Sequence, residues 1–410
     1  MSATSQPEQA LALALAGTAA RRARVRPLAD ALVVQVDPEL LAATLSASGL
    51  LPLLGGRAAE LAGARWPSTF ADEVARAHAR ASRAGTAQEL LTVRVLRELE
   101  RTGVRALALK GPLLGRAIHG QAGLRVSSDV DLLVDPHDVL RACAVLGEFG
   151  YRDSSADAMR DAHGRPVLHH ALTPSTPGLP PIDLHWRVHW YEEAYATEVV
   201  SHSIADPLRV RRPRPEDELA MLLLMFARDG FVGLRLATDV AAWWDTHGAM
   251  VATGAIGAIA DRHPALAEPL AAAGRCAQRA VGLPAAALGL SAPRSVRART
   301  ATRLLNWPAR GSRAQVLANA SLVDGLLTPR GQYHAFVSRH LSRTASVSSS
   351  SGATAGPTRP LSATLHPLRV AARYAVALAR IAVRREWAPL PADQAAAISR
   401  SAAGDAALRA

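Results

Sequence analysis

One segment, Asp129-Val-Asp-Leu-Leu-Val134, constrains the fold more than any other part of the chain. Successive side chains of a strand point to opposite faces of the sheet. The two aspartates, Asp129 and Asp131, therefore share one face. The other face is wholly apolar and consists of Val130, Leu132 and Val134. The segment predicts a strand that buries its apolar face and presents two carboxylates on the other.

Further strand-like and helix-like segments lie on both sides of this strand. The strand candidates are residues 104–110, 127–134, 166–172 and 182–188, and Gly150-Tyr151 opens another turn or strand. Residues 113–119 and 137–149 fit short helices, and residues 70–100 fit a long amphipathic helix that Gly103 ends. The order β-α-β-α-β-β over about 90 residues describes a small α/β unit.

The chain of 410 residues is long enough for about two to three domains. Prolines break the Ala/Leu/Arg-rich stretch 1–85, which predicts a helical N-terminal region. The core that contains the strands covers 86–200, and a helical domain follows over 201–341. Residues 342–364 are rich in Ser, Thr and Gly and predict a flexible linker. A basic helix and tail occupy 365–410.

The composition excludes several protein classes. Two cysteines are too few for a disulfide scaffold or a four-thiolate zinc site. The sequence has no run of about 18 uncharged apolar residues, which a membrane-spanning helix would need. The order of charges around Ala10–Ala16 is wrong for a secretory signal. We therefore expect a cytoplasmic protein. The formal net charge is +12, but the arginines are spread along the chain, so a nucleic-acid partner is not favoured.

A third carboxylate follows in a second alternating segment, Ile182-Asp-Leu-His-Trp-Arg187, where Asp183 and His185 share one face. If this strand lies beside the first, Asp183 converges with Asp129 and Asp131. Three carboxylates can hold two divalent cations for an in-line displacement at phosphorus. Mg²⁺ prefers such oxygen ligands together with substrate phosphates, so we predict Mg²⁺, with Mn²⁺ as the alternative.

The sequence contains a single lysine, Lys110, among 47 basic residues. It is followed by Gly111, at a predicted turn from strand to helix. Glycine lets the backbone approach a phosphate, and a helix N-terminus and an ammonium group both attract one. Because arginine occupies the other basic positions, we interpret Lys110 as a phosphate contact rather than a solvated surface residue.

Taken together, these motifs resemble those of the uncharacterised bacterial nucleotidyltransferase family with a minimal DNA-polymerase-β-type core. They are Leu109-Lys-Gly111, Arg125-x-x-x-Asp129-Val-Asp131-Leu-Leu-Val134, Gly150-Tyr151 and Asp183-Leu-His185-Trp186. The resemblance covers about residues 90–245. It implies an α+β fold, in which a small mixed-sheet core is flanked by helical N-terminal and C-terminal regions. It also implies transfer of a nucleoside monophosphate from a Mg²⁺-bound nucleoside triphosphate, ATP among the candidates.

The same resemblance assigns roles to individual residues. Asp129 and Asp131 would be metal ligands, and Asp183 would be the third ligand, at the metal that activates the acceptor. Asp131 and Asp183 are thus the predicted catalytic residues. The predicted nucleotide contacts are Lys110, Gly111, Arg125 and Ser128. His185 is predicted to contact the metal ligands and hold them in place, without binding the metal itself. The Gly-Ser or Gly-Gly phosphate motif of the wider superfamily is absent, and Lys110-Gly111 stands in its place.

Several alternatives remain open at this stage. An Asp-x-Asp motif with a metal also fits a nucleotide-sugar glycosyltransferase, and a catalytically inactive nucleotidyltransferase-like protein could serve binding or regulation. Arg125 fits phosphate contact or a pair with Asp129. Arg235 and Asp239 are four residues apart and fit an intrahelical pair. The acceptor is a hydroxyl or phosphate on a small molecule, a peptide or a protein.

Overall fold

The computed structural model describes residues 7–61, 66–152, 168–190, 192, 194–303 and 313–332. Its helices are α1 Pro7–Ala14, α2 Ala19–Arg24, α3 Arg26–Val33, α4 Pro38–Ala47, α5 Gly56–Ala59, α6 Ser68–Arg101, α7 Pro112–His119, α8 Val139–Glu148, α9 Ala194–Ser201, α10 Pro215–Arg228, α11 Leu234–His247, α12 Ala255–Arg262, α13 Ala267–Val281, α14 Val296–Thr302 and α15 Arg313–Leu327. Its strands are β1 Ala106–Ala108, β2 Val130–Val134, β3 Tyr151–Arg152, β4 His169–Pro174, β5 Ile182–His185, β6 Ile204–Ala205 and β7 Arg211–Arg212. The predicted linker 342–364 and basic helix 365–410 lie outside the described residues.

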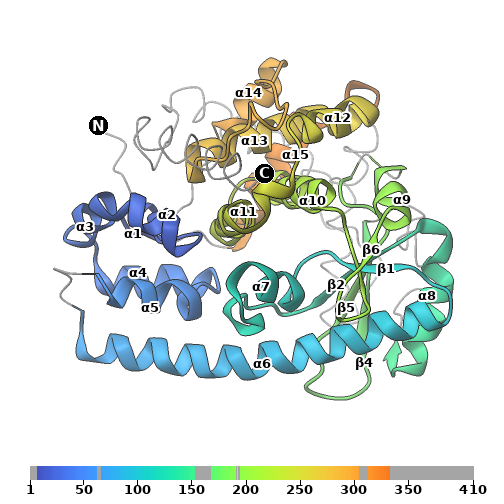
Figure 1. Cartoon of the computed structure of the whole chain (residues 1–410), viewed down its shortest axis with the longest axis horizontal. Coiled ribbons are helices and arrows are strands. Elements are labelled where there is room, and N and C mark those ends of the chain that lie inside the picture. Colours follow the sequence, from blue (N-terminus) through green and yellow to red (C-terminus); the bar gives the residue numbers. More distant parts are fainter. Residues whose placement is uncertain are drawn as a thin grey trace, which may run out of the picture.

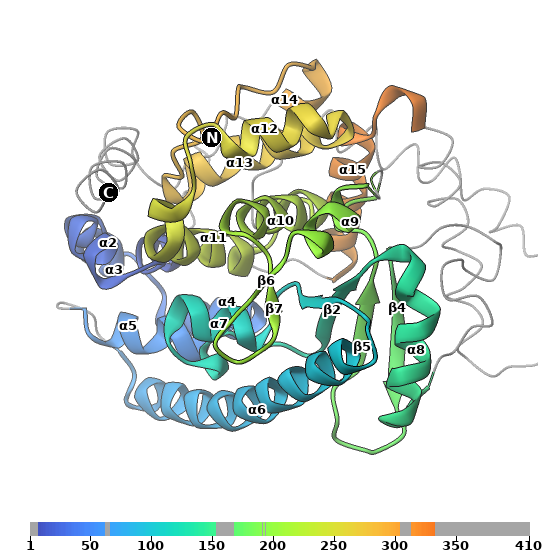
Figure 2. The same ribbon diagram turned by 45° about the vertical axis from the view of Figure 1, so that its right-hand side comes forward.

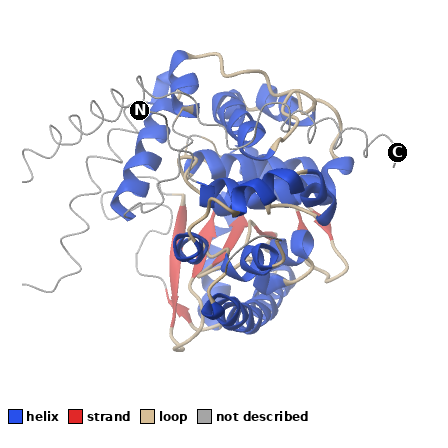
Figure 3. Cartoon of the chain, turned by 90° about the vertical axis from the view of Figure 1, so that its left-hand side faces the viewer, coloured by secondary structure: helices blue, strands red, loops and turns tan. Residues whose placement is uncertain are grey.

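The strands form one mixed sheet in the order β3-β4-β5-β2-β1-β7-β6. The central strand β2 pairs in parallel with β5 and antiparallel with β1. Strand β4 continues the sheet antiparallel to β5. Figure 3 shows the strands gathered in one part of the molecule, with helices around them. The structure confirms the predicted α+β class and the mixed sheet.

The apolar face of the sheet packs on two helices. Its buried side chains are Val130, Leu132 and Val134 from β2 and Ile182 and Leu184 from β5. They share one hydrophobic cluster with residues of α6 and α8, including Val95, Leu99 and Leu146. Burying this layer removes apolar surface from water and fixes which way both strands face. The opposite face of β2 and β5, which carries their polar residues, is thereby directed toward the helices that follow the sheet.

The long helix α6 runs along one side of the whole molecule (Figure 1). Its bounds agree with the helix predicted over residues 70–100, and Gly103 with a φ of +80° follows its end. A positive φ favours glycine, which explains why the helix ends there. The predicted boundary at residue 85 falls inside α6, so this helix contacts both the N-terminal helices and the sheet.

The remaining helices lie on the other side of the sheet and beside it. Helices α10, α11 and α13 pack together, and the N-terminal helix α1 contacts α11 (Figures 1 and 2). A buried ion pair, Arg21 Nη2 to Asp245 Oδ1 at 2.7 Å, joins α2 to α11. In the described part of the chain, no helix has both the length and the apolar character required to cross a membrane.

The structure differs from the predicted strands mainly in length. Strand β1 covers only the middle of 104–110, and β5 ends three residues before 188. Strands β6 and β7 were not predicted from the sequence, because each has two residues and a segment that short shows no alternation. The unpredicted pair extends the sheet beyond β1 through Arg211, which pairs with Leu107.

Candidate active site

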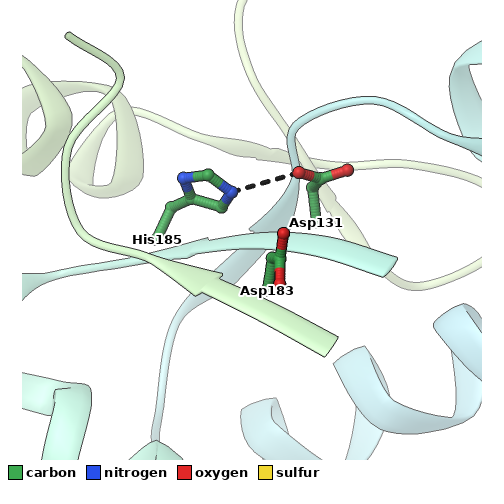
Figure 4. Close-up of side chains that lie close together, drawn as sticks. All are labelled: Asp131, Asp183 and His185. Atoms are coloured by element: carbon green, nitrogen blue, oxygen red, sulfur yellow. Dashed lines mark hydrogen bonds and ion pairs between the residues drawn. The ribbon is translucent and has the colours of Figure 1, made fainter. Parts of the chain in front are cut away.

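Two aspartates from neighbouring strands meet on the polar face of the sheet. Strands β2 and β5 are parallel, and their register pairs Asp131 with Asp183 and Leu133 with His185. Side chains at paired positions of adjacent strands point to the same face. As a result, ligand atoms of Asp131, Asp183 and His185 all lie within 4.8 Å of one another (Figure 4). Alternation within each strand predicted that these side chains would converge if the two strands were neighbours, and their pairing meets that condition.

Asp131 and His185 are both almost fully enclosed, with 3% and 2% of their surfaces exposed. Oδ1 of Asp131 lies 3.1 Å from Nε2 of His185, and Oδ2 of Asp131 lies 2.8 Å from Nζ of Lys110. Burial alone would raise the pKa of Asp131. The hydrogen bond from His185 and the charge of Lys110 outweigh burial and hold this pKa well below its usual value. Asp131 is therefore a permanent anion near neutral pH.

Asp183 has the opposite electrostatic character. Burial, followed by the negative charges of Asp131 and Asp129, raises the pKa of Asp183 to about 6. Two carboxylates this close repel each other unless a cation lies between them. Within one small cluster, Asp131 thus stays ionised, whereas Asp183 takes up a proton more readily than an ordinary aspartate.

Two histidines line the same cluster. His185 is buried, and burial lowers its pKa. His169, from β4, pairs with His185 across the sheet, and their ring centroids are 4.7 Å apart. Its Nε2 lies 3.7 Å from Oδ2 of Asp183. Burial also lowers the pKa of His169 to about 3, so it is neutral near pH 7. The ring of His169 therefore borders the carboxylates.

Lys110 and Gly111 lie at the turn between β1 and α7. The backbone N–H of Leu109 donates to the carbonyl oxygen of Asp131 at 3.1 Å, which brings the next residue, Lys110, beside that carboxylate. Gly111 has a φ of +86° and open space where a Cβ would be. The chain then enters α7, with Pro112 in its first turn. Sequence reasoning selected Lys110 for phosphate contact and did not anticipate its ion pair with Asp131.

Asp129 and Ser128 stand at the entrance to β2. Asp129 comes one residue before the strand, and its Oδ1 accepts a hydrogen bond from Ser127 Oγ at 3.0 Å. It is not among the three residues whose ligand atoms converge, although its charge contributes to the raised pKa of Asp183. Ser128 is exposed. The structure therefore brings together Asp131, Asp183 and His185, with Asp129 next to them.

The structure corrects two expected pairs. Arg125 does not pair with Asp129; its Nη2 lies 2.9 Å from Oδ2 of Asp239, and both side chains are almost fully buried. Asp239 does not form the predicted intrahelical pair either. Arg235 instead donates to the carbonyl oxygens of Ser48 and Val126. These contacts join residues more than a hundred positions apart, which short-range spacing could not reveal.

One further cation near the site was missed. Arg228 ends α10, and its positive charge lowers the pKa of Asp183 and of both histidines. In the described residues its ion pair is with the adjacent Asp229, at 3.4 Å. Arg228 is one of 46 arginines, so no feature of the sequence distinguished it.

The donor set of this cluster fits a divalent cation. Asp131 and Asp183 offer hard oxygen ligands, and His185 adds an imidazole nitrogen within the same 4.8 Å. The raised pKa of Asp183 records a repulsion that a cation would relieve. The cluster could therefore hold a divalent cation.

Comparison with known proteins agrees with this geometry. A family model described as "Uncharacterised nucleotidyltransferase" matches residues 35–282, which is more than half of the chain. The match includes all the site residues discussed above and extends into α13. A comparison with curated proteins finds no match.

Proposed function

The chain belongs to the uncharacterised nucleotidyltransferase family, and we propose that it transfers a nucleoside monophosphate from a nucleoside triphosphate to an acceptor hydroxyl or phosphate. Mg²⁺ is the proposed ion and Mn²⁺ its substitute. Asp131 and Asp183 are the proposed ligands, with Asp129 as a third when its carboxylate leaves Ser127. The family membership favours this reaction over sugar transfer, which the Asp-x-Asp pattern alone also fits.

The observation that supports the proposal most strongly is the parallel register of β2 and β5. It places Asp131 opposite Asp183 on the sheet face that lies opposite the apolar layer packed on α6 and α8. Two adjacent carboxylates in a half-buried position are unfavourable for stability, as the pKa of Asp183 shows. Folds keep such unfavourable arrangements mainly at functional sites.

Each residue of the cluster has a task in this proposal. When bound, a divalent cation would neutralise part of the triphosphate charge and lower the pKa of the acceptor hydroxyl. Asp131, charged at all relevant pH values, holds the cation. Asp183, which lies opposite Asp131 on the neighbouring strand, is the group that we propose to receive the acceptor's proton on a carboxylate oxygen. His185 holds Asp131 in position through the 3.1 Å hydrogen bond.

Phosphate binding falls to the turn that follows β1. Lys110 carries the positive charge, and Gly111 leaves open space beside the backbone. The backbone N–H groups at the start of α7 add a positive partial charge. Arg228 adds a second positive charge near the carboxylates. The acceptor oxygen attacks the α-phosphorus, and the bond from this phosphorus to the pyrophosphate leaving group breaks. The turn, Lys110 and Arg228 would bind the pyrophosphate as it leaves.

Calorimetric titration with ATP, GTP, CTP and UTP tests this proposal without knowledge of the acceptor. We expect binding of at least one triphosphate that requires Mg²⁺ or Mn²⁺. Asp131→Asn should remove the metal-dependent part of this binding. Asp135→Asn is the matched control, because Asp135 follows the same strand but caps the turn at His137. No metal-dependent binding by the parent protein, or equal loss in both variants, contradicts the proposal.

A further inference from the structure

Both oxygens of the central carboxylate are engaged by side chains of the protein itself. Oδ1 of Asp131 receives the hydrogen bond from His185, and Oδ2 forms the ion pair with Lys110 at 2.8 Å. The side chain of Asp131 is only 2% exposed, so solvent cannot replace either partner. An ion that binds Oδ2 of Asp131 must therefore take the place of the lysine.

A divalent cation and the Lys110 ammonium exclude each other at this oxygen. A metal bond is about 2.1 Å long, so a metal at Oδ2 would lie within about 5 Å of an ammonium that stayed 2.8 Å from the same oxygen. At that separation like charges repel strongly in a partly buried site. The ammonium group must move away before the metal can bind Oδ2.

The lysine is free to make this movement, whereas the histidine is not. Lys110 is 21% exposed and carries its charge on a flexible stem. His185 is 2% exposed and is fixed within β5 beside His169. The turn at Gly111 and the start of α7 lie immediately after Lys110, and these are the groups that we propose for phosphate binding. A triphosphate there would offer the ammonium group a new anionic partner.

We propose that Lys110 couples the two ligands: it blocks Asp131 against a free divalent cation and releases Asp131 when a triphosphate binds. This inference rests on the proposed function and adds to it the order in which the metal and the nucleotide bind. The metal enters together with the nucleotide rather than before it. Because binding free energies are linked, the metal must strengthen nucleotide binding by the same factor.

The test measures metal binding directly and requires no turnover. Electron paramagnetic resonance counts free Mn²⁺ during titration of the full-length protein, with and without an α,β-methylene nucleoside triphosphate, which cannot be cleaved at the reacting bond. In the parent protein we expect weak Mn²⁺ binding alone and much tighter binding with the analogue. Lys110→Met should bind Mn²⁺ alone about tenfold to a hundredfold more tightly than the parent, the range expected from removing one charge-assisted contact. After correction for the Mn²⁺ that the analogue binds by itself, the analogue should strengthen Mn²⁺ binding by a smaller factor in this variant than in the parent.

Two further variants separate the ion pair from general electrostatics. Lys110→Gln removes the charge but keeps a donor for Asp131, and it replaces Lys110→Met if that variant fails to fold. Arg228→Met also removes a nearby positive charge, but Arg228 has no ion pair with Asp131 in the described residues. Arg228→Met should tighten Mn²⁺ binding much less than either Lys110 variant.

The outcomes distinguish this inference from the proposed function. If neither Lys110 variant binds Mn²⁺ more tightly than the parent, or if Arg228→Met has the same effect, the lysine does not compete with the metal. That result overturns the coupling and leaves metal-dependent nucleotide binding intact. If the analogue binds neither the parent nor any variant, the proposed function fails. This failure is distinguishable, because the Lys110 variants can still bind Mn²⁺ more tightly than the parent does.

Discussion

Replacement of Asp183 by asparagine is expected to stabilise the fold while it removes a proposed catalytic residue. The pKa of Asp183 is raised from 3.8 to about 6 by burial and by two neighbouring carboxylates. The folded state therefore binds this proton more tightly than the unfolded state does. The contribution of this proton to the free energy of unfolding is fully present below pH 3.8 and is lost as the pH rises to about 6. Asparagine has no charge to repel at any pH.

The size of the effect follows from the pKa. One pKa unit corresponds to about 1.4 kcal/mol, so the difference between 3.8 and about 6 corresponds to at most about 3 kcal/mol above pH 6. The part of Asp183 that is exposed, 20% of its side chain, screens some of this repulsion. At pH 7.5 we expect Asp183→Asn to raise the free energy of unfolding by about 1–3 kcal/mol. At pH 4 the increase should nearly vanish.

Urea unfolding of both proteins at pH 4 and pH 7.5, with a chelator present, measures this difference. The chelator matters because a bound cation would stabilise the parent protein and reverse the sign. The exposed Asp261→Asn on α12 controls for removal of a charge elsewhere. The reasoning fails if Asp183→Asn is less stable than the parent at pH 7.5, or if the two proteins differ equally at both pH values.

Two stability predictions concern the scaffold around the site. Asp239→Ala leaves Arg125 buried without its partner and is expected to cost about 3–5 kcal/mol in urea unfolding; a loss below 1 kcal/mol would contradict the buried pair. Gly85→Ala places a Cβ against the backbone of Gly123, closer than van der Waals contact allows, and is expected to cost about 1–3 kcal/mol, seen as a lower Tm. Gly147→Ala, in open space on α8, is the matched control and should be neutral or stabilising.

The sequence predicted which side chains face the site, but it did not predict their contacts. Alternation within β2 and β5 placed Asp131 and Asp183 on the polar faces of their strands, because the apolar residues between them need a core. The parallel pairing that unites the two strands is a long-range property, and the alternation could only suggest it. The family resemblance supplied the roles of the residues rather than their distances.

Other features of the site depend on contacts that no local pattern records. Lys110 attracted attention as the single lysine, yet its ion pair links it to a residue on the next strand. The partner of Arg125 lies on α11, 114 positions away. Arg228 reaches the site from the helical part of the chain. The ion pair of Lys110 depends on the pairing of β1 with β2, and the other two features depend on how α10 and α11 pack over the sheet. The packing of separate elements is not encoded in spacing.

Transfer of label from the α-phosphate of a nucleoside triphosphate tests the central claim most directly. The protein is incubated with Mg²⁺, α-labelled or γ-labelled triphosphate, and an extract of cells that produce it as the source of acceptor. The account predicts that α-label becomes attached to an acceptor and that γ-label is released in pyrophosphate. It also predicts that Asp131→Asn transfers nothing, whereas Asp135→Asn transfers normally. Transfer of γ-label to the acceptor, or undiminished transfer by Asp131→Asn, would contradict the account.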